Sequence, residues 1–129
     1  MARKKSPTLT EAELRLMDVL WAQGDCTVTD VVAALGDPPL AYNTVLTTLR
    51  ILETKGYVKH RAVGRAFVYA PKVGQEEARS NVIDYVVSRF FDNSPRALML
   101  KLLDADSLDE REVKRIRALL DRAAGEENV

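Results

Sequence analysis

The first half of the chain places apolar side chains at helical spacing. Leucine, methionine and tryptophan recur every three or four residues between positions 14 and 21, which predicts an amphipathic helix over about 11–23. Thr10 and Glu13 have the spacing of a capping box at its start. Two further helices are expected in this half, one starting near Thr27 and ending at Gly36, the other over about 42–55 and closed by Gly56.

After residue 56 the pattern changes from helical to alternating. Two strands are expected, over 57–62 and 66–70, with Gly64 at the turn between them. Helix, strand fragment, helix, helix and hairpin is the order of a winged helix-turn-helix. We therefore expect such a domain over residues 8–73, mainly helical and with a small β-hairpin as its wing.

The rest of the chain is predicted to be helical and rich in apolar residues. Three helices are expected, over about 75–91, from Ser94-Pro95, and from a second capping box at Ser107 and Glu110. Three short helices cannot bury so much apolar surface by themselves. Residues 74–124 are therefore expected to form a helical dimerisation domain, which we favour over folding back onto the first domain. Its expected contact residues are Val86, Phe90, Phe91, Leu98, Leu102, Leu103, Ile116, Leu119 and Leu120.

Charge is balanced over the whole chain but not along it. The chain has 19 basic and 19 acidic residues, so its net charge favours no class of partner. Residues 40–72, however, hold six basic residues against one acidic residue, whereas residues 8–39 hold one basic residue against six acidic ones. A local basic segment is typical of a surface that binds nucleic acid, and a solvated basic face is the alternative.

The predicted third helix lies in this basic segment and has two different faces. Val45, Leu49 and Leu52 share one face and are expected in the core. The other side suits a helix that reads bases in a major groove, because its small polar side chains can bond to base edges. An exposed helix face that is merely rich in threonine is the alternative, although threonine is a poor helix former. This side carries Asn43, Thr44, Leu46, Thr47, Thr48, Arg50, Ile51 and Thr54.

The hairpin adds basic side chains that can reach a DNA backbone. Arg65 stands beside Gly64 at the turn, and Lys59 and Arg61 are expected near the same turn. Such contacts position a protein on DNA without reading its sequence. The candidate DNA-binding set is therefore Asn43, Thr44, Leu46, Thr47, Arg50 and Arg65.

Other chemistry is sparse in this sequence. A single cysteine, Cys26, and a single histidine, His60, allow no internal disulfide and no metal cluster, and Cys26, Met17 and Trp21 are expected in the core. The chain shows neither a nucleophile–base pair nor a glycine-rich phosphate loop, so we expect no enzyme activity and no cofactor. No apolar run is long enough to span a membrane and no secretory signal is visible, so a cytoplasmic protein without membrane insertion is expected.

Three stretches of the sequence, 9–21, 40–58 and 64–71, resemble the penicillinase-repressor family, which includes the methicillin-resistance repressors and, more distantly, copper-responsive repressors. The resemblance implies a winged-helix DNA-binding domain, a C-terminal helical dimerisation domain and repression from palindromic operators on double-stranded DNA. It places four residues on the groove-facing part of the recognition helix and one on the wing, namely Asn43, Thr44, Leu46, Thr47 and Arg65.

The sequence also departs from that family at several positions. Ala41 stands where some relatives start the recognition helix with serine, and Leu46 and Ile51 stand where some carry arginine. Copper sensing is not expected, because the C-terminal cysteine cluster of the copper-responsive members is missing. In antibiotic-responsive members a protease, paired with a membrane sensor, cleaves the C-terminal domain. The matching bond, near Lys101–Leu102, lacks the Asn-Phe pair of those relatives, so inactivation by such a protease stays open.

The sequence thus predicts a homodimeric transcriptional repressor that recognises a palindromic operator and controls beta-lactam or related stress-response genes. Two other classes remain. A regulator controlled by a small molecule would need a polar pocket between the domains. A winged helix that binds another protein would need an apolar, uncharged face on its third helix.

Overall fold

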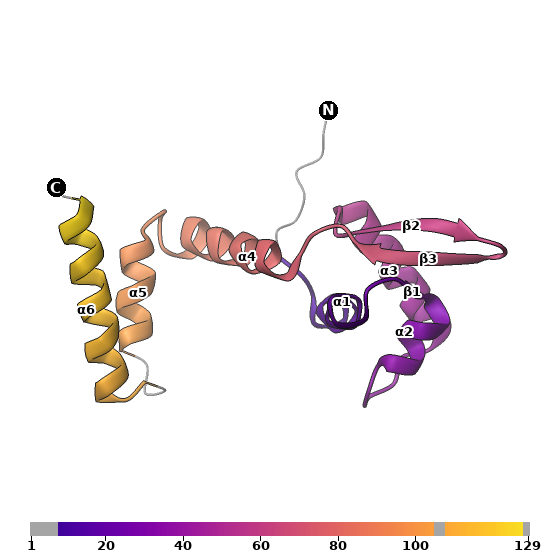
Figure 1. Ribbon diagram of the computed structural model, residues 1–129, viewed down its shortest axis with the longest axis horizontal. Helices are drawn as coiled ribbons and strands as arrows, with labels where there is room; N and C mark the ends of the chain where they lie inside the picture. The colour runs from indigo at the N-terminus through magenta and orange to yellow at the C-terminus, as the bar shows by residue number, and fades with distance from the viewer. Residues whose placement is uncertain (1–7, 105–107, 128–129) are drawn as a thin grey trace. The chain divides into compact units, whose positions relative to one another are not determined.

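The elements follow one another in the order that the sequence pattern predicts, as the computed structural model shows for residues 8–104 and 108–127 (Figure 1). The predicted winged-helix class is confirmed. Two compact units are present, one up to Tyr85 and one from Val86. The expected division of function after residue 73 stays a prediction. The elements are α1 (Glu11–Gln23), β1 (Cys26–Thr27), α2 (Val28–Ala34), α3 (Tyr42–Lys55), β2 (Val58–Val63), β3 (Ala66–Pro71), α4 (Gln75–Phe90), α5 (Pro95–Leu103) and α6 (Glu110–Glu127).

Local hydrogen bonds explain where the first helices begin. At the start of α1 the Glu13 amide donates to the Thr10 hydroxyl (3.2 Å), and the Thr10 amide donates to the Glu13 carboxylate (2.8 Å). Thr27 and Asp30 form the same reciprocal pair at the start of α2. Each pair satisfies two amides that the first helical turn leaves without a partner. The expected box at Thr10 is thereby confirmed.

A three-stranded antiparallel sheet carries the wing. Its strand order is β1-β3-β2, so β3 is the central strand. Cys26 of β1 lies opposite Tyr69 of β3, and at the far end of the hairpin Val63 lies opposite Ala66. Figure 1 shows β2 and β3 continuing past α3 as a two-stranded ribbon. Gly64 makes the turn between them with a φ of 61°, a conformation that glycine adopts readily.

One core holds the first unit together. The fully buried side chains come from α1, α2, α3, β1, β2 and β3, and they include Leu16, Met17, Leu20, Cys26, Val31, Val45, Leu49, Leu52, Val58 and Tyr69. Trp21 packs against this core and its indole nitrogen donates to the carbonyl of Val73 (2.9 Å). The core positions expected for Met17 and Cys26 are confirmed. Leu14, which belongs to the apolar stripe predicted for this helix, is 38% exposed.

A buried ion pair ties α1 to the end of α3. The Lys55 ammonium lies 2.8 Å from a carboxylate oxygen of Glu13, and the two side chains are only 22% and 5% exposed. Burial alone raises the pKa of Glu13, but the bonds from Lys55 and Thr10 outweigh it and hold the pKa below its ordinary value of 4.5. The pair therefore fixes the carboxyl end of α3 against α1.

The second unit has no buried residue of its own among those described. Its α5 begins at Ser94, whose hydroxyl accepts from the amide of Ala97 (3.1 Å), as Ser94-Pro95 predicts. At the start of α6 the Asp109 carboxylate accepts from the amide of Glu112 (2.8 Å). The predicted capping residue Ser107 lies outside the described residues. Within the described ranges, every helix is too short or too polar to cross a membrane.

Candidate nucleic-acid interface

The two faces of α3 separate as its spacing predicts. Val45, Leu49 and Leu52 are fully buried, so the helix lies with one side against the core. Asn43, Thr44 and Thr47 are exposed near its amino end. Because the buried face fixes the rotation of the helix, these three polar side chains are presented together to the outside.

Two residues of the expected polar side lie elsewhere. Thr48 is buried, and its hydroxyl donates to the carbonyl of Thr44 (2.7 Å), so the expectation that Thr48 belongs to the outer face is wrong. It lies three residues after Val45, which places it on the core side of a helix. Leu46, a candidate DNA contact, is half-buried and packs partly against the core. Only its outer part remains for a ligand.

A shallow hollow lies between α3 and the wing. Its volume is about 260 Å³, and its lining includes Leu46 and Arg50 of α3, Arg65 at the hairpin turn, and residues at the start of α2. Two further lining residues, Tyr42 and Phe67, are 51% and 47% exposed. Sequence reasoning missed both. The sequence gives a weak indication for Tyr42, because a large aromatic residue outside the apolar stripe of its helix is expected to be exposed and available for a contact.

Arg50 is exposed but it is not without an interaction. Burial raises the pKa of the Tyr69 phenol and the nearby Glu53 raises it further, whereas the charge of Arg50 and a side-chain hydrogen bond from it act in the opposite direction. The guanidinium is therefore held beside Tyr69. A guanidinium has five donors, so this contact leaves others free for an anion.

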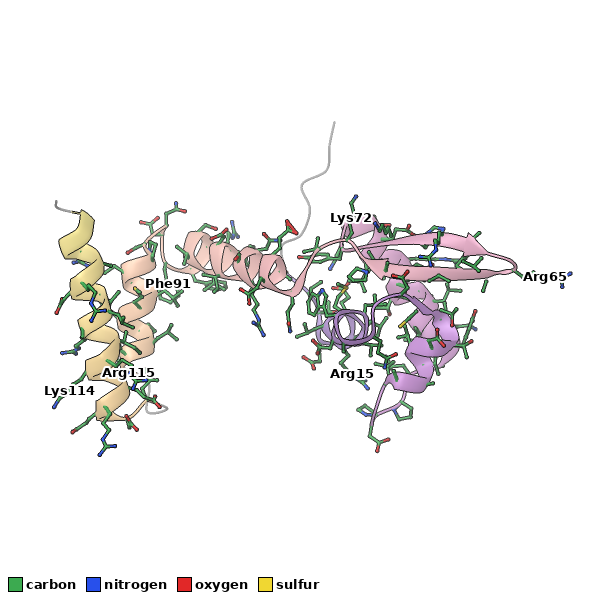
Figure 2. All side chains as sticks on the ribbon, in the orientation of Figure 1. Arg15, Arg65, Lys72, Phe91, Lys114 and Arg115 are labelled. Atoms are coloured by element: carbon green, nitrogen blue, oxygen red, sulfur yellow. The ribbon has the colours of Figure 1, made fainter. Side chains whose placement is uncertain are left out.

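The tip of the wing carries one of the candidate basic residues, Arg65. Figure 2 shows Arg65 at the outer end of the hairpin, directed away from the body of the first unit. It is exposed and has no ion-pair partner within the described ranges. The position expected beside Gly64 is thereby observed.

The basic residues of β2, Lys59 and Arg61, are not at the turn. Arg61 lies opposite Val68 and Lys59 opposite Ala70, so both stand along the strand, and Lys59 lies farther from the turn than expected. The Arg61 guanidinium is also 2.7 Å from a carboxylate oxygen of Asp25. A strand advances about 3.3 Å per residue, so four residues place Lys59 well away from the tip.

His60 joins the wing to α3. Its Nδ1 lies 2.6 Å from a carboxylate oxygen of Glu53, and its ring contacts Phe67 edge-on at 4.9 Å between centroids. The histidine is exposed. These contacts hold the base of the hairpin against α3.

None of the candidate dimerisation residues is buried in the single chain. Phe90 is 72% exposed, Leu102 54% and Leu119 53%. The other six are half-buried, namely Val86, Phe91, Leu98, Leu103, Ile116 and Leu120. Figure 2 labels Phe91 just beyond the end of α4. Within the described residues no group of histidine, cysteine, aspartate and glutamate could hold a metal ion.

Comparisons with known proteins agree with this geometry. The family model described as Penicillinase repressor matches residues 9–122. The Penicillinase repressor of Bacillus licheniformis is 27% identical over 119 residues, covering 92% of this chain and 93% of that protein. The Transcriptional regulator BlaI of Mycobacterium tuberculosis is 32% identical over 127 residues, covering 96% of this chain and 91% of that protein.

A solved structure gives the same result for the first unit. The solution structure of the DNA binding domain of the repressor BlaI is 32% identical and superposes with a TM-score of 0.51. It corresponds to 58% of this chain and to 93% of that domain. The matched relatives are regulators that bind DNA, not enzymes.

Proposed function

This chain belongs to the penicillinase repressor family of DNA-binding transcriptional repressors, and we propose that it acts as a homodimer on a palindromic operator. In this proposal α3 of each protomer enters a major groove and the wing contacts the backbone beside it. The observation that carries the proposal is the exposed polar amino end of α3 together with the hollow that this helix and Arg65 line.

The roles of the side chains follow from their chemistry. Asn43 can bond to both edge groups of adenine, and Thr44 and Thr47 can bond to either kind of edge group or touch a thymine methyl. Arg50 and Arg65 flank the hollow between α3 and the wing, where a phosphate can bind both guanidinium groups. The exposed part of Leu46 offers an apolar contact between the polar residues of α3 and the two arginines.

The second unit supports dimerisation. All nine apolar candidates between Val86 and Leu120 are exposed or half-buried in the single chain. Apolar surface of this kind is unfavourable in water and is typical of an interface. Two linked protomers also bind a palindrome with avidity that one lacks. The exposed amino end of α3 carries Asn43, Thr44 and Thr47, and these polar side chains disfavour the alternative of a protein-interaction module.

The roles of α3 and the wing can be separated by two substitutions. Arg65→Ala should weaken binding to operator and scrambled DNA about equally, and it should reduce the slope of log affinity against log salt by about 0.9 per contact. Thr47→Ala should leave the salt slope unchanged and reduce discrimination among operator variants by about 1–3 kcal/mol. Thr48→Ala is the matched control, because that neighbour is buried. Binding is measured at several salt concentrations.

The reversed result would contradict the assignment. If Thr47→Ala weakened every DNA equally while Arg65→Ala changed the preferred sequence, the wing would be the reader. A loss of discrimination in Thr48→Ala as large as that in Thr47→Ala would show that the effect comes from the helix and not from the base contact.

Dimerisation is tested on the full chain with two glutamine substitutions. Phe90→Gln should shift sedimentation toward the monomer, since it removes a side chain that is 72% exposed and whose loss costs the monomer little. Arg89→Gln, an exposed neighbour on α4, is the control and should stay dimeric. Operator affinity should fall with Phe90→Gln only. Equal behaviour of both variants would place the interface elsewhere.

We also propose that the regulated genes belong to the response to beta-lactams or a related stress, on the basis of the names that the relatives carry. An inactivating protease paired with a membrane sensor is a further proposed partner. Lys101 and Leu102 are exposed, but they lie in the last turn of α5. Because that turn is helical, a protease can bind this bond only after the turn unwinds. Reporter expression from the operator with and without a beta-lactam tests this.

A further inference from the structure

A second, larger cleft lies between α1 and α4 within the first unit. Its volume is about 640 Å³. The walls are mainly apolar, with Leu9, Leu14 and Trp21 on one side and Val82 and Ile83 on the other. None of the lining residues comes from α3 or the wing, so the cleft is separate from the candidate nucleic-acid interface.

The cleft is already formed in the isolated chain. Ala78 of α4 is buried, which holds that helix against the core beside the cleft. The hydrogen bond from Trp21 to the carbonyl of Val73 fixes the indole that forms part of its wall. Ligand sites of proteins are typically preformed, mostly apolar and 300–1,000 Å³ in volume. This cleft has the size and the walls of such a site.

The charges at the cleft favour a positive ligand. Asp18 lines it and has no ion-pair partner in the described part of the chain. Arg79 also lines it, but its guanidinium is 2.8 Å from a carboxylate oxygen of Glu76, so its charge is balanced locally. Trp21 lies three residues after Asp18 on the same helix face and adds an indole, whose face attracts cations.

We propose that this cleft binds a lipophilic cation, a small molecule with an apolar body and one ammonium group. The apolar body lies between Leu14 and Ile83, and the ammonium lies by Asp18 and Trp21. Asp18 is the one acidic residue among the residues that line the cleft. The inference concerns this cleft alone, so it can fail while the DNA-binding proposal holds.

Intrinsic fluorescence reports directly on the cleft, because Trp21 is the chain's one tryptophan. The probes are octyltrimethylammonium, octanol and octyl sulfate, which share the apolar chain and differ in charge, each kept below its micelle concentration. We expect saturable fluorescence changes with affinity in the order cation, alcohol, anion. Isothermal titration calorimetry on the same samples measures binding independently of the fluorophore.

Three full-length variants separate the contributions. Asp18→Asn should weaken octyltrimethylammonium about fivefold and leave octanol unchanged, since partly exposed ion-pair and cation–π contacts are each modest. Asp84→Asn removes an exposed carboxylate of α4 that does not line the cleft, and it should change neither affinity. Ile83→Gln should weaken both probes, and because Ile83 is 54% exposed the fold should persist.

Several outcomes would overturn the proposal. They are the absence of a saturable signal by both methods, an affinity for octyl sulfate equal to that for the cation, and an equal loss in Asp18→Asn and Asp84→Asn. Operator binding by the same samples, measured without any probe, distinguishes these failures from a failure of the proposed DNA-binding function. Thermal unfolding confirms that each variant is folded.

Discussion

Replacing Lys55 by methionine should expose how much the first unit depends on its buried ion pair. Methionine keeps most of the side-chain volume and removes the ammonium that lies 2.8 Å from Glu13. The Glu13 carboxylate, which is only 5% exposed, would then keep its hydrogen bonds from Thr10 but no charged partner among the described residues. A buried charge without its partner is costly, and that cost is the measured quantity.

The size of the effect lies between two limits. Breaking a fully buried pair costs about 3–5 kcal/mol, whereas exposed pairs contribute about 0.2–1 kcal/mol. Lys55 is 22% exposed, so water reaches its ammonium while Glu13 stays shielded. We therefore expect a loss of about 2 kcal/mol in the free energy of unfolding at pH 7. For a unit of this size that corresponds to a fall in Tm of about 8–15 °C.

The loss should depend on pH in a definite direction. In the native chain the pKa of Glu13 is lowered, so its contribution is complete above 4.5 and disappears as pH falls through the lower folded value. Without Lys55, burial dominates and the pKa of Glu13 should rise above 4.5. The free-energy cost of the buried Glu13 charge then disappears when the carboxylate is protonated. The difference between the two proteins should therefore shrink as pH falls from 7 to 4.

Urea unfolding followed by circular dichroism measures this difference at each pH. Lys59→Met is the matched control, because Lys59 is exposed on β2 and has no ion-pair partner in the described ranges. It should change the free energy of unfolding by no more than about 0.5 kcal/mol. Equal losses in the two variants, or a Lys55 effect that is constant with pH, would refute the reasoning.

Three further substitutions test other contacts of the fold. Gly56→Ala should destabilise the chain by about 1–2 kcal/mol in urea unfolding, because residue 56 has a φ of 90° at the end of α3. Trp21→Phe should cost about 1 kcal/mol in the same assay, since it removes the hydrogen bond to Val73. Ser94→Ala removes the acceptor for the amide of Ala97 and should cost about 1 kcal/mol, read as helicity lost on heating.

Most of the fold could be predicted from the sequence because its signals are local. The reciprocal bonds of Thr10 with Glu13 and of Thr27 with Asp30 join residues three apart, so the sequence itself predicts where these helices start. The change from helical to alternating pattern after Gly56 marks the hairpin in the same way. Such features require no knowledge of what the segment packs against.

The candidate interface was predicted less completely, for two different reasons. Thr48 could have been placed in the core, because it shares a helix face with Val45 and Leu52, and its hydroxyl can bond to the preceding turn. Because threonine is polar, its position on the apolar face of α3 was not recognised as a core position. Leu46 lies three residues before buried Leu49, so the spacing indicates partial burial, and tertiary packing sets how much of the side chain stays exposed.

The opposite charges of residues 8–39 and 40–72 partly neutralise one another once the chain folds. Arg61 pairs with Asp25, 36 residues away, so a basic residue of the wing is withheld from DNA. Asp25→Asn should release it and steepen the salt dependence of DNA binding by about 0.9 on the logarithmic scale, with sequence preference unchanged. Asp37→Asn removes an equal charge from the same acidic segment but frees no arginine, so its slope should stay as in the native chain. If both variants steepened the slope alike, general repulsion from the acidic segment would explain the effect, and Arg61 would have no part in binding.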